Sequence, residues 1–160
     1  MTTSGPNLAD LPPAMAELAE DFNAVGEAER LQLLLELSNE LPSLPERYAG
    51  HLDLMERVDE CQSPVFLAVE VDDDPERHVH LYFDAPAEAP TTRGFAGILH
   101  ESLDGLPADT VLGVPDDAPY RFGLAQAVSP LRLRGMTGML ARIKRQVRAR
   151  RAAVDAGSGP

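Results

Sequence analysis

The only cysteine of the 160-residue chain, Cys61, is the side chain best suited to covalent chemistry. A thiolate is a strong nucleophile, but a thiol with an ordinary pKa of about 8.5 is only a few per cent ionised at neutral pH. Asp59 and Glu60 precede Cys61 and disfavour the anion further. Because lone cysteines are more often buried small apolar residues than nucleophiles, residue type alone leaves both interpretations open.

A single cysteine also limits what this chain can bind. It excludes an internal disulfide and every thiolate-rich zinc or iron–sulfur site built by one chain. His78 and His80 lie two apart on a predicted strand, without a nearby pair of carboxylates or thiols at metal-ligand spacing, so we expect solvated histidines and no metal. An imidazole beside Cys61 would instead define a Cys-dependent hydrolase, which is one alternative function.

Charge is distributed unevenly along the chain. Residues 1–120 hold 25 acidic and 5 basic residues, whereas residues 121–160 hold 9 basic residues and one acid. The basic residues near the end are Arg142, Lys144, Arg145, Arg148, Arg150 and Arg151. They allow a second alternative, a binding module whose C-terminal helix grips phosphates or an acidic protein. Without interleaved aromatic residues, this run does not predict nucleic-acid binding.

The hydrophobic pattern predicts the elements that must position Cys61. Helical spacing of apolar residues predicts helices over residues 13–25, 27–39, 90–103, 107–112 and from 130 onward. Residues 64–71 and 78–83 predict two antiparallel strands joined by the acidic turn at 72–75, and residues 113–127 could contain a third. The expected fold class is therefore α+β, with a small antiparallel sheet packed against N- and C-terminal helices.

The length of the chain fits one domain. We expect it to span residues 11–152, with a flexible N-terminal tail at 1–10 and a flexible C-terminal tail at 153–160. No apolar run approaches the roughly 20 residues needed to cross a bilayer, and no secretory signal is visible at the start. A cytoplasmic location without membrane contact is therefore expected.

Four short segments of the chain form a recognisable series. The first is Cys61-Gln62-Ser63, followed by an apolar strand. The other three are Leu-Ser-Asn-Glu-Leu-Pro within residues 34–45, Arg-Gly-Phe-Ala-Gly-Ile-Leu at 93–99, and the Ser-Pro-Leu-Arg segment that begins the helix of residues 128–144. In type and order these segments resemble the SufE family of sulfur-acceptor proteins, the first being similar to its cysteine motif, and the resemblance covers about residues 11–150.

The resemblance implies a SufE/NifU (IscU)-like fold and a role as an accessory protein rather than an enzyme. Cys61 would carry sulfur as a persulfide, received from a SufS-type cysteine desulfurase that the chain also stimulates, for a downstream iron–sulfur scaffold complex. The chain itself would bind no cofactor, because the pyridoxal phosphate belongs to the desulfurase. We expect the Cys61 loop to be partly shielded in the free protein and to turn outward when the partner docks.

The resemblance also suggests supporting residues. Arg132 matches an arginine near the family's cysteine site, where it would stabilise a thiolate or persulfide anion; otherwise it caps a helix or meets solvent. Glu88 occupies what resembles an Asp position of the family near the active loop. Gln62 and Ser63 are expected to shape the cysteine loop by local hydrogen bonds.

Overall fold

The protein is described here by a computed structural model that covers residues 7–157. Its helices are α1 (Pro13–Asn23), α2 (Glu27–Glu40), α3 (Pro90–Leu103), α4 (Ala108–Leu112) and α5 (Pro130–Gly157). Its strands are β1 (Glu56–Arg57), β2 (Phe66–Val71) and β3 (Val79–Asp84). Short 3-10 turns are η1 (Leu52–Leu54), η2 (Ala118–Arg121) and η3 (Leu124–Gln126). The predicted α+β class is confirmed.

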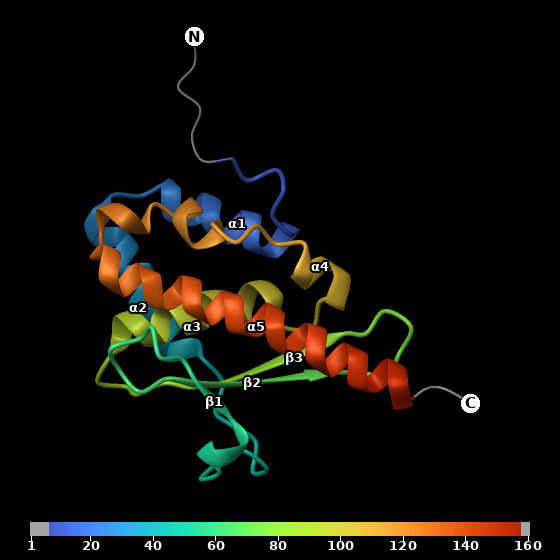
Figure 1. Ribbon diagram of the computed structural model, residues 1–160. Coiled ribbons are helices and arrows are strands. Elements are labelled where there is room, and N and C mark those ends of the chain that lie inside the picture. Colours follow the sequence, from blue (N-terminus) through green and yellow to red (C-terminus); the bar gives the residue numbers. More distant parts are fainter. Residues whose placement is uncertain (1–6, 158–160) are drawn as a thin grey trace.

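The three strands form one antiparallel sheet in the order β1-β2-β3. The predicted hairpin of β2 and β3 is confirmed, with Val69 opposite Leu81. Side chains alternate along β3, so Leu81 is buried while His80 and Tyr82 are half-buried on the other face. Helices α3 and α5 lie across the sheet, and the remaining helices pack outside them (Figure 1). This arrangement is the layered solution that the amphipathic pattern predicts.

Helix α3 lies at the centre of the helical layer and packs closely against α2, because two of its residues at the contact are glycines. A Cβ atom on Gly97 would lie 2.5 Å from the backbone oxygen of Leu37, and one on Gly94 would lie 2.6 Å from that of Leu34. Any side chain at either position would therefore push the two helices apart. Phe22 of α1 and Phe122, which follows η2, also belong to the core. Their rings pack edge to face, with 5.7 Å between the ring centroids.

Two sequence predictions need correction. Residues 113–127 contain no strand: they form η2 and η3, because Pro115 and Pro119 cannot donate to a ladder. The third strand is β1, a two-residue segment in a region for which the sequence predicts no strand.

Both ends of the described chain are tied to the rest of the domain. Helix α5 continues past residue 152 to Gly157, and Arg77 holds its end through an ion pair with Asp155 at 2.9 Å. Near the other end, Arg121 Nη1 donates to Asp10 Oδ1 at 2.7 Å. Residues 1–6 and 158–160 of the predicted tails lie outside the described residues. Within residues 7–157, no helix has the length and apolar character needed to cross a membrane.

Candidate functional site

Cys61 lies in the loop that connects β1 to β2. Val58 N donates to Val65 O at 2.9 Å, which continues the β1–β2 ladder beyond the strands. Cys61 N donates to Val58 O at 3.1 Å and closes the turn. The sheet therefore fixes both ends of the loop and places the thiol near its tip, a common arrangement for a reactive group.

The thiol opens onto a small pocket. Cys61 is only 7% exposed, and the pocket beside it has a volume of about 40 Å³. Its lining residues are Glu60, Cys61, Gln62, Ser63, Thr92, Leu131 and Arg132. Because a single water needs about 10–15 Å³ of such space, the pocket has room for a few small atoms. Gln62, Leu131 and Arg132 are exposed, so the pocket reaches the surface without exposing the sulfur itself.

Helix α5 accommodates the cysteine loop with two glycines. A Cβ atom on Gly135 would lie 3.0 Å from Cys61 Sγ, closer than carbon and sulfur normally approach. A Cβ atom on Gly138 would lie 2.7 Å from Glu60 Cδ. Positions three apart share one face of a helix, so these glycines form a notch in which the loop rests.

An arginine on the same helix holds the loop. Arg142 donates to Glu60 Oε1 from Nη2 at 2.8 Å and from Nε at 3.1 Å, and to Glu56 Oε2 from Nη1 at 2.6 Å. Its side chain is only 19% exposed. These three residues, the Arg142 clamp, connect α5 to β1 and to the residue next to the thiol.

Burial keeps the thiol protonated. Desolvation is the main cause that raises the pKa of Cys61 from 9.0 to about 11, the negative charge of Glu60 raises it further, and Arg142 opposes this. The hydrogen bonds from Arg142 lower the pKa of Glu60, so that carboxylate stays charged beside the thiol. In this buried position Cys61 is therefore a neutral, weakly nucleophilic thiol.

Several predicted site residues lie together in this pocket. Gln62, Ser63 and Arg132 line it with Cys61. Within residues 7–157, however, Gln62 and Ser63 make no side-chain hydrogen bond, in contrast to the prediction; the backbone of Val58 and the Arg142 clamp shape the loop instead. The guanidinium of Arg132 is exposed and has no ion-pair partner in the described part of the chain, while its backbone N–H donates to Ser129 Oγ at 3.3 Å.

Glu88 is not brought to this pocket. It is exposed in the loop between β3 and α3 and is not among the lining residues. Conversely, the structure adds Thr92, a buried residue of α3 that lines the pocket, and the glycines Gly135 and Gly138, none of which the sequence predicts as site residues. The spacing of the two glycines within a predicted helix is the one sequence signal of this close contact.

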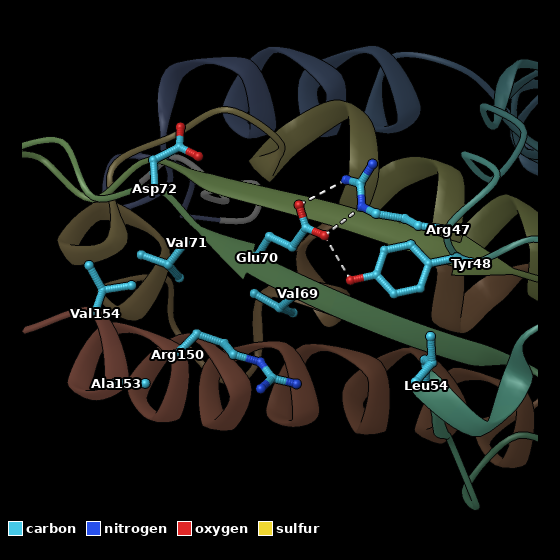
Figure 2. A pocket seen from close by; sticks show the side chains of 10 residues that line it. All are labelled: Arg47, Tyr48, Leu54, Val69, Glu70, Val71, Asp72, Arg150, Ala153 and Val154. Atoms are coloured by element: carbon cyan, nitrogen blue, oxygen red, sulfur yellow. Dashed lines mark hydrogen bonds and ion pairs between the residues drawn. The ribbon is translucent and has the colours of Figure 1, made fainter. Parts of the chain in front are cut away.

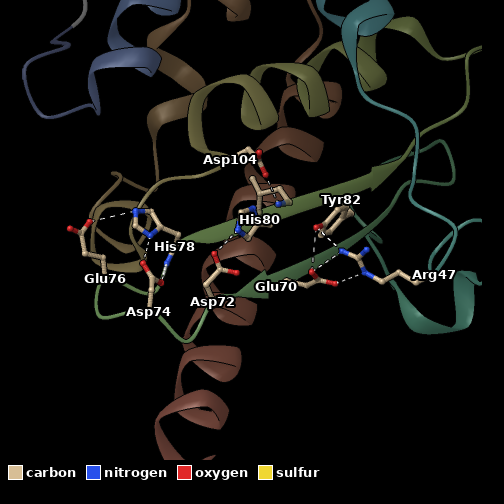
Figure 3. A network of polar contacts seen from close by, with 10 residues as sticks. Arg47, Glu70, Asp72, Asp74, Glu76, His78, His80, Tyr82 and Asp104 are labelled. Carbon is tan, nitrogen blue, oxygen red and sulfur yellow. Dashed lines mark hydrogen bonds and ion pairs between the residues drawn. The ribbon is translucent and has the colours of Figure 1, made fainter. Parts of the chain in front are cut away.

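The histidines lie elsewhere. None of the four lines the cysteine pocket, so a Cys–His hydrolase lacks its base. Figure 3 shows His80 Nε2 beside Asp72 Oδ2, 2.8 Å apart, and His78 Nδ1 bonded to Asp74. The acidic turn thus folds back onto β3 and pairs a carboxylate with each of these two partly exposed histidines. Among the described residues, no group of three or more His, Cys, Asp or Glu side chains is arranged to hold a metal.

Most of the basic C-terminal run serves the fold. Besides Arg142, Arg145 pairs with Glu56, Lys144 with Asp116 at 2.8 Å and Arg151 with Asp109 at 2.5 Å. These intramolecular pairs neutralise much of the positive charge on which the binding-module alternative depends.

Comparison with known proteins agrees with this arrangement. The family model "SufE: Fe-S metabolism associated domain" matches residues 16–147, so the chain belongs to the SufE family and to the proteins of iron–sulfur metabolism. The site's single thiol on a sheet-anchored loop lies within the matched range.

Individual relatives cover nearly the whole chain. Uncharacterized SufE-like proteins of two Mycobacterium tuberculosis strains are 56% identical over 140 residues, which are 88% of this chain and 95% of theirs. The "SufE-like protein 1, chloroplastic/mitochondrial" of Arabidopsis thaliana is 28% identical over 83% of this chain and 34% of its own length. The solution structure of a hypothetical protein from Thermus thermophilus matches with a TM-score of 0.77 and 38% identity, covering 89% of this chain and 98% of that one.

Proposed function

We propose that this chain accepts persulfide sulfur on Cys61 from a SufS-type cysteine desulfurase, stimulates that enzyme and passes the sulfur to an iron–sulfur scaffold complex. The observation that carries the proposal is the sole thiol of a SufE-family chain, shielded in a pocket that reaches the surface. One thiol can hold sulfur but cannot by itself coordinate a cluster. The chain acts without a cofactor of its own, because the pyridoxal phosphate acts in the partner.

The transfer is an exchange between a thiol and a persulfide. Cys61 Sγ attacks the outer sulfur of the partner's persulfide, and the bond between that sulfur and the partner's cysteine breaks. Cys61 gives up its proton, and the departing thiolate takes one up. A thiol and a persulfide thus become a persulfide and a thiol, and no additional oxidant or reductant is consumed.

Docking of the desulfurase must move the Cys61 loop outward, because the buried position of Cys61 in the free protein suppresses its attack on the persulfide. A side chain that is 7% exposed with a pKa near 11 is a poor nucleophile at neutral pH. Outward movement removes the burial that is the main cause of the high pKa. It also brings the thiolate toward water and toward the exposed guanidinium of Arg132, which lines the same pocket and favours an anion.

The test is the rate at which a pyridoxal-phosphate cysteine desulfurase consumes L-cysteine with and without this chain. Wild type is expected to raise the turnover, and Cys61→Ser to abolish the increase. Arg132→Ala should reduce the increase by about tenfold, as expected for loss of a nearby opposite charge. Arg134→Ala is the matched control, because Arg134 is exposed on the same helix and does not line the pocket. Unchanged turnover with wild type, or equal effects of the two arginine variants, would contradict the proposal.

A further inference from the structure

A second open site lies far from the thiol. It is a groove of about 580 Å³ along the edge of β2, between Tyr48 and Leu54 on one side and the last turns of α5 on the other (Figure 2). Cys61 contacts α5 at Gly135, whereas the groove reaches Arg150. At 1.5 Å per helical residue these positions are about 22 Å apart, so the groove is separate from the cysteine pocket.

Backbone groups of β2 point into this groove. Asp72 N donates to His78 O at 2.9 Å, so the even-numbered residues of β2 face β3 and the odd-numbered residues face outward. Val69 N faces outward and donates to Gln146 Oε1 at 3.1 Å. The N–H and the oxygen of Val71 also face outward, and no residue between 7 and 157 bonds to them. The oxygen of Val69 faces the same way, but Val69 is only 1% exposed.

The opposite side of the sheet is covered where β3 begins. Val79 N donates to Leu106 O at 2.8 Å, Gly105 N donates to Val79 O at 2.7 Å, and Leu81 N donates to Asp104 Oδ1 at 2.8 Å. The loop after α3 therefore satisfies both outer groups of Val79 and the outer N–H of Leu81. On the other side, the part of β2 beyond its pairing with β1 has no such cover, so its outward groups at Val71 remain open to another strand.

The chain between residues 7 and 157 leaves this position vacant. Glu56 lies opposite Leu67, so continuing β1 in the same register would place residue 54 opposite Val69 and residue 52 opposite Val71. Those residues instead form η1 and turn away from the sheet. As a result Leu54 is 56% exposed at the wall of the groove.

The charges of the groove favour an acidic occupant. Glu70 is already bonded by Arg47 at 2.9 Å and by Tyr48 at 2.8 Å, and Asp72 is paired with His80. Arg150 is exposed and has no polar partner within residues 7–157. It is the unmatched charge of the groove, and a carboxylate is its natural counterpart.

We propose that this groove binds an extended segment of a partner protein, which adds as a strand to the edge of β2. Its backbone pairs with Val71, an acidic side chain meets Arg150, and an apolar side chain covers Leu54. A second copy of this chain fits less well, because its own β2 edge lies between η1 and α5 and is not free to enter a groove. A segment bound here leaves Cys61 accessible, so this inference goes beyond sulfur transfer.

The test is selection of a random heptapeptide library against the full chain, followed by anisotropy titration of the enriched peptides. We expect enriched sequences that alternate apolar residues and contain Asp or Glu. Arg150→Glu should weaken their binding by about tenfold. Arg148→Glu is the matched control, because Arg148 is exposed on the same helix but does not line the groove. Val71→Pro, which removes one outward N–H, should weaken binding, whereas Val71→Thr should not.

Direct measurements distinguish the outcomes. The bound peptide should slow hydrogen exchange at the Val71 amide and leave alkylation of Cys61 unchanged. A chain that does not bind peptides can therefore still accept sulfur, so the two proposals can fail independently. The proposal is overturned if no sequence is enriched or if binding is indifferent to Arg150→Glu. It is also overturned if sedimentation shows a dimer that Leu54→Lys dissociates, because a second copy would then be the occupant.

Discussion

Glu60→Gln is expected to make Cys61 more reactive in the free protein. The carboxylate of Glu60 raises the pKa of the thiol, and Arg142 lowers it. The amide keeps the shape of the side chain and an oxygen that accepts from Arg142, but it removes the negative charge. The substitution therefore lowers the pKa of Cys61 while the loop stays in its notch on α5.

The size of the effect follows from the ranking of the causes. With a pKa of about 11, roughly one Cys61 thiol in a thousand is ionised at pH 8. Burial is the larger of the two causes that raise the pKa from 9.0, and Arg142 opposes both, so Glu60 contributes less than burial does. Each step of one in pKa changes the thiolate fraction about tenfold. Glu60→Gln should therefore accelerate alkylation at pH 8 by on the order of tenfold.

The assay is the rate of iodoacetamide alkylation from pH 7 to 10.5, followed by intact mass, which is unambiguous because the chain has one cysteine. Wild type should show a rate that still rises with pH above 10. Asp59→Asn is the matched control: it removes the same charge from the same loop, but Asp59 is 78% exposed and does not contribute to the raised pKa of Cys61, so the variant should have little effect. A wild-type thiol that titrates near 8.5, or equal rates for both variants, would refute the electrostatic argument.

Three further predictions concern the packing of the loop and the fold. Gly135→Ala should accelerate alkylation of Cys61 and lower the free energy of unfolding by about 1–2 kcal/mol, because the new Cβ displaces the sulfur; urea denaturation and alkylation rates measure both effects. Gly97→Ala should cost about 3 kcal/mol in the same denaturation assay, whereas Gly157→Ala, which meets nothing within 4 Å, should not destabilise the protein. Because the folded state retains a proton on Cys61 above the unfolded pKa of 9.0, the free energy of unfolding should fall between pH 9 and 11 by up to about 2 kcal/mol more in wild type than in Cys61→Ala; parallel pH profiles would exclude this linkage.

The main elements of the fold could be predicted because their patterns are local. The apolar repeat of residues 90–103 and the alternation along β3 reflect burial of one face, which the sequence records directly. β1 could not be predicted in this way. Glu56 and Arg57 have no apolar alternation, and they form a strand only because β2 and the contacts of Glu56 with α5 hold them there.

The candidate site was only partly predictable for the same reason. Cys61 could be selected because it is the sole thiol and because its neighbours resemble a family motif. The Arg142 clamp joins residues 82 and 86 positions apart, and within the basic run Arg142 does not differ from its neighbours. Such long-range ion pairs depend on the packing of α5 against the loop, which no local pattern specifies.

The decisive measurement is the mass of the chain and of its Cys61 peptide after reaction with a desulfurase and L-cysteine. We expect the intact chain to gain the mass of one or more sulfur atoms, fragmentation to place them on Cys61, and a thiol reductant to remove them. If Cys61 stays unmodified while the desulfurase carries its own persulfide, this chain is not a sulfur acceptor.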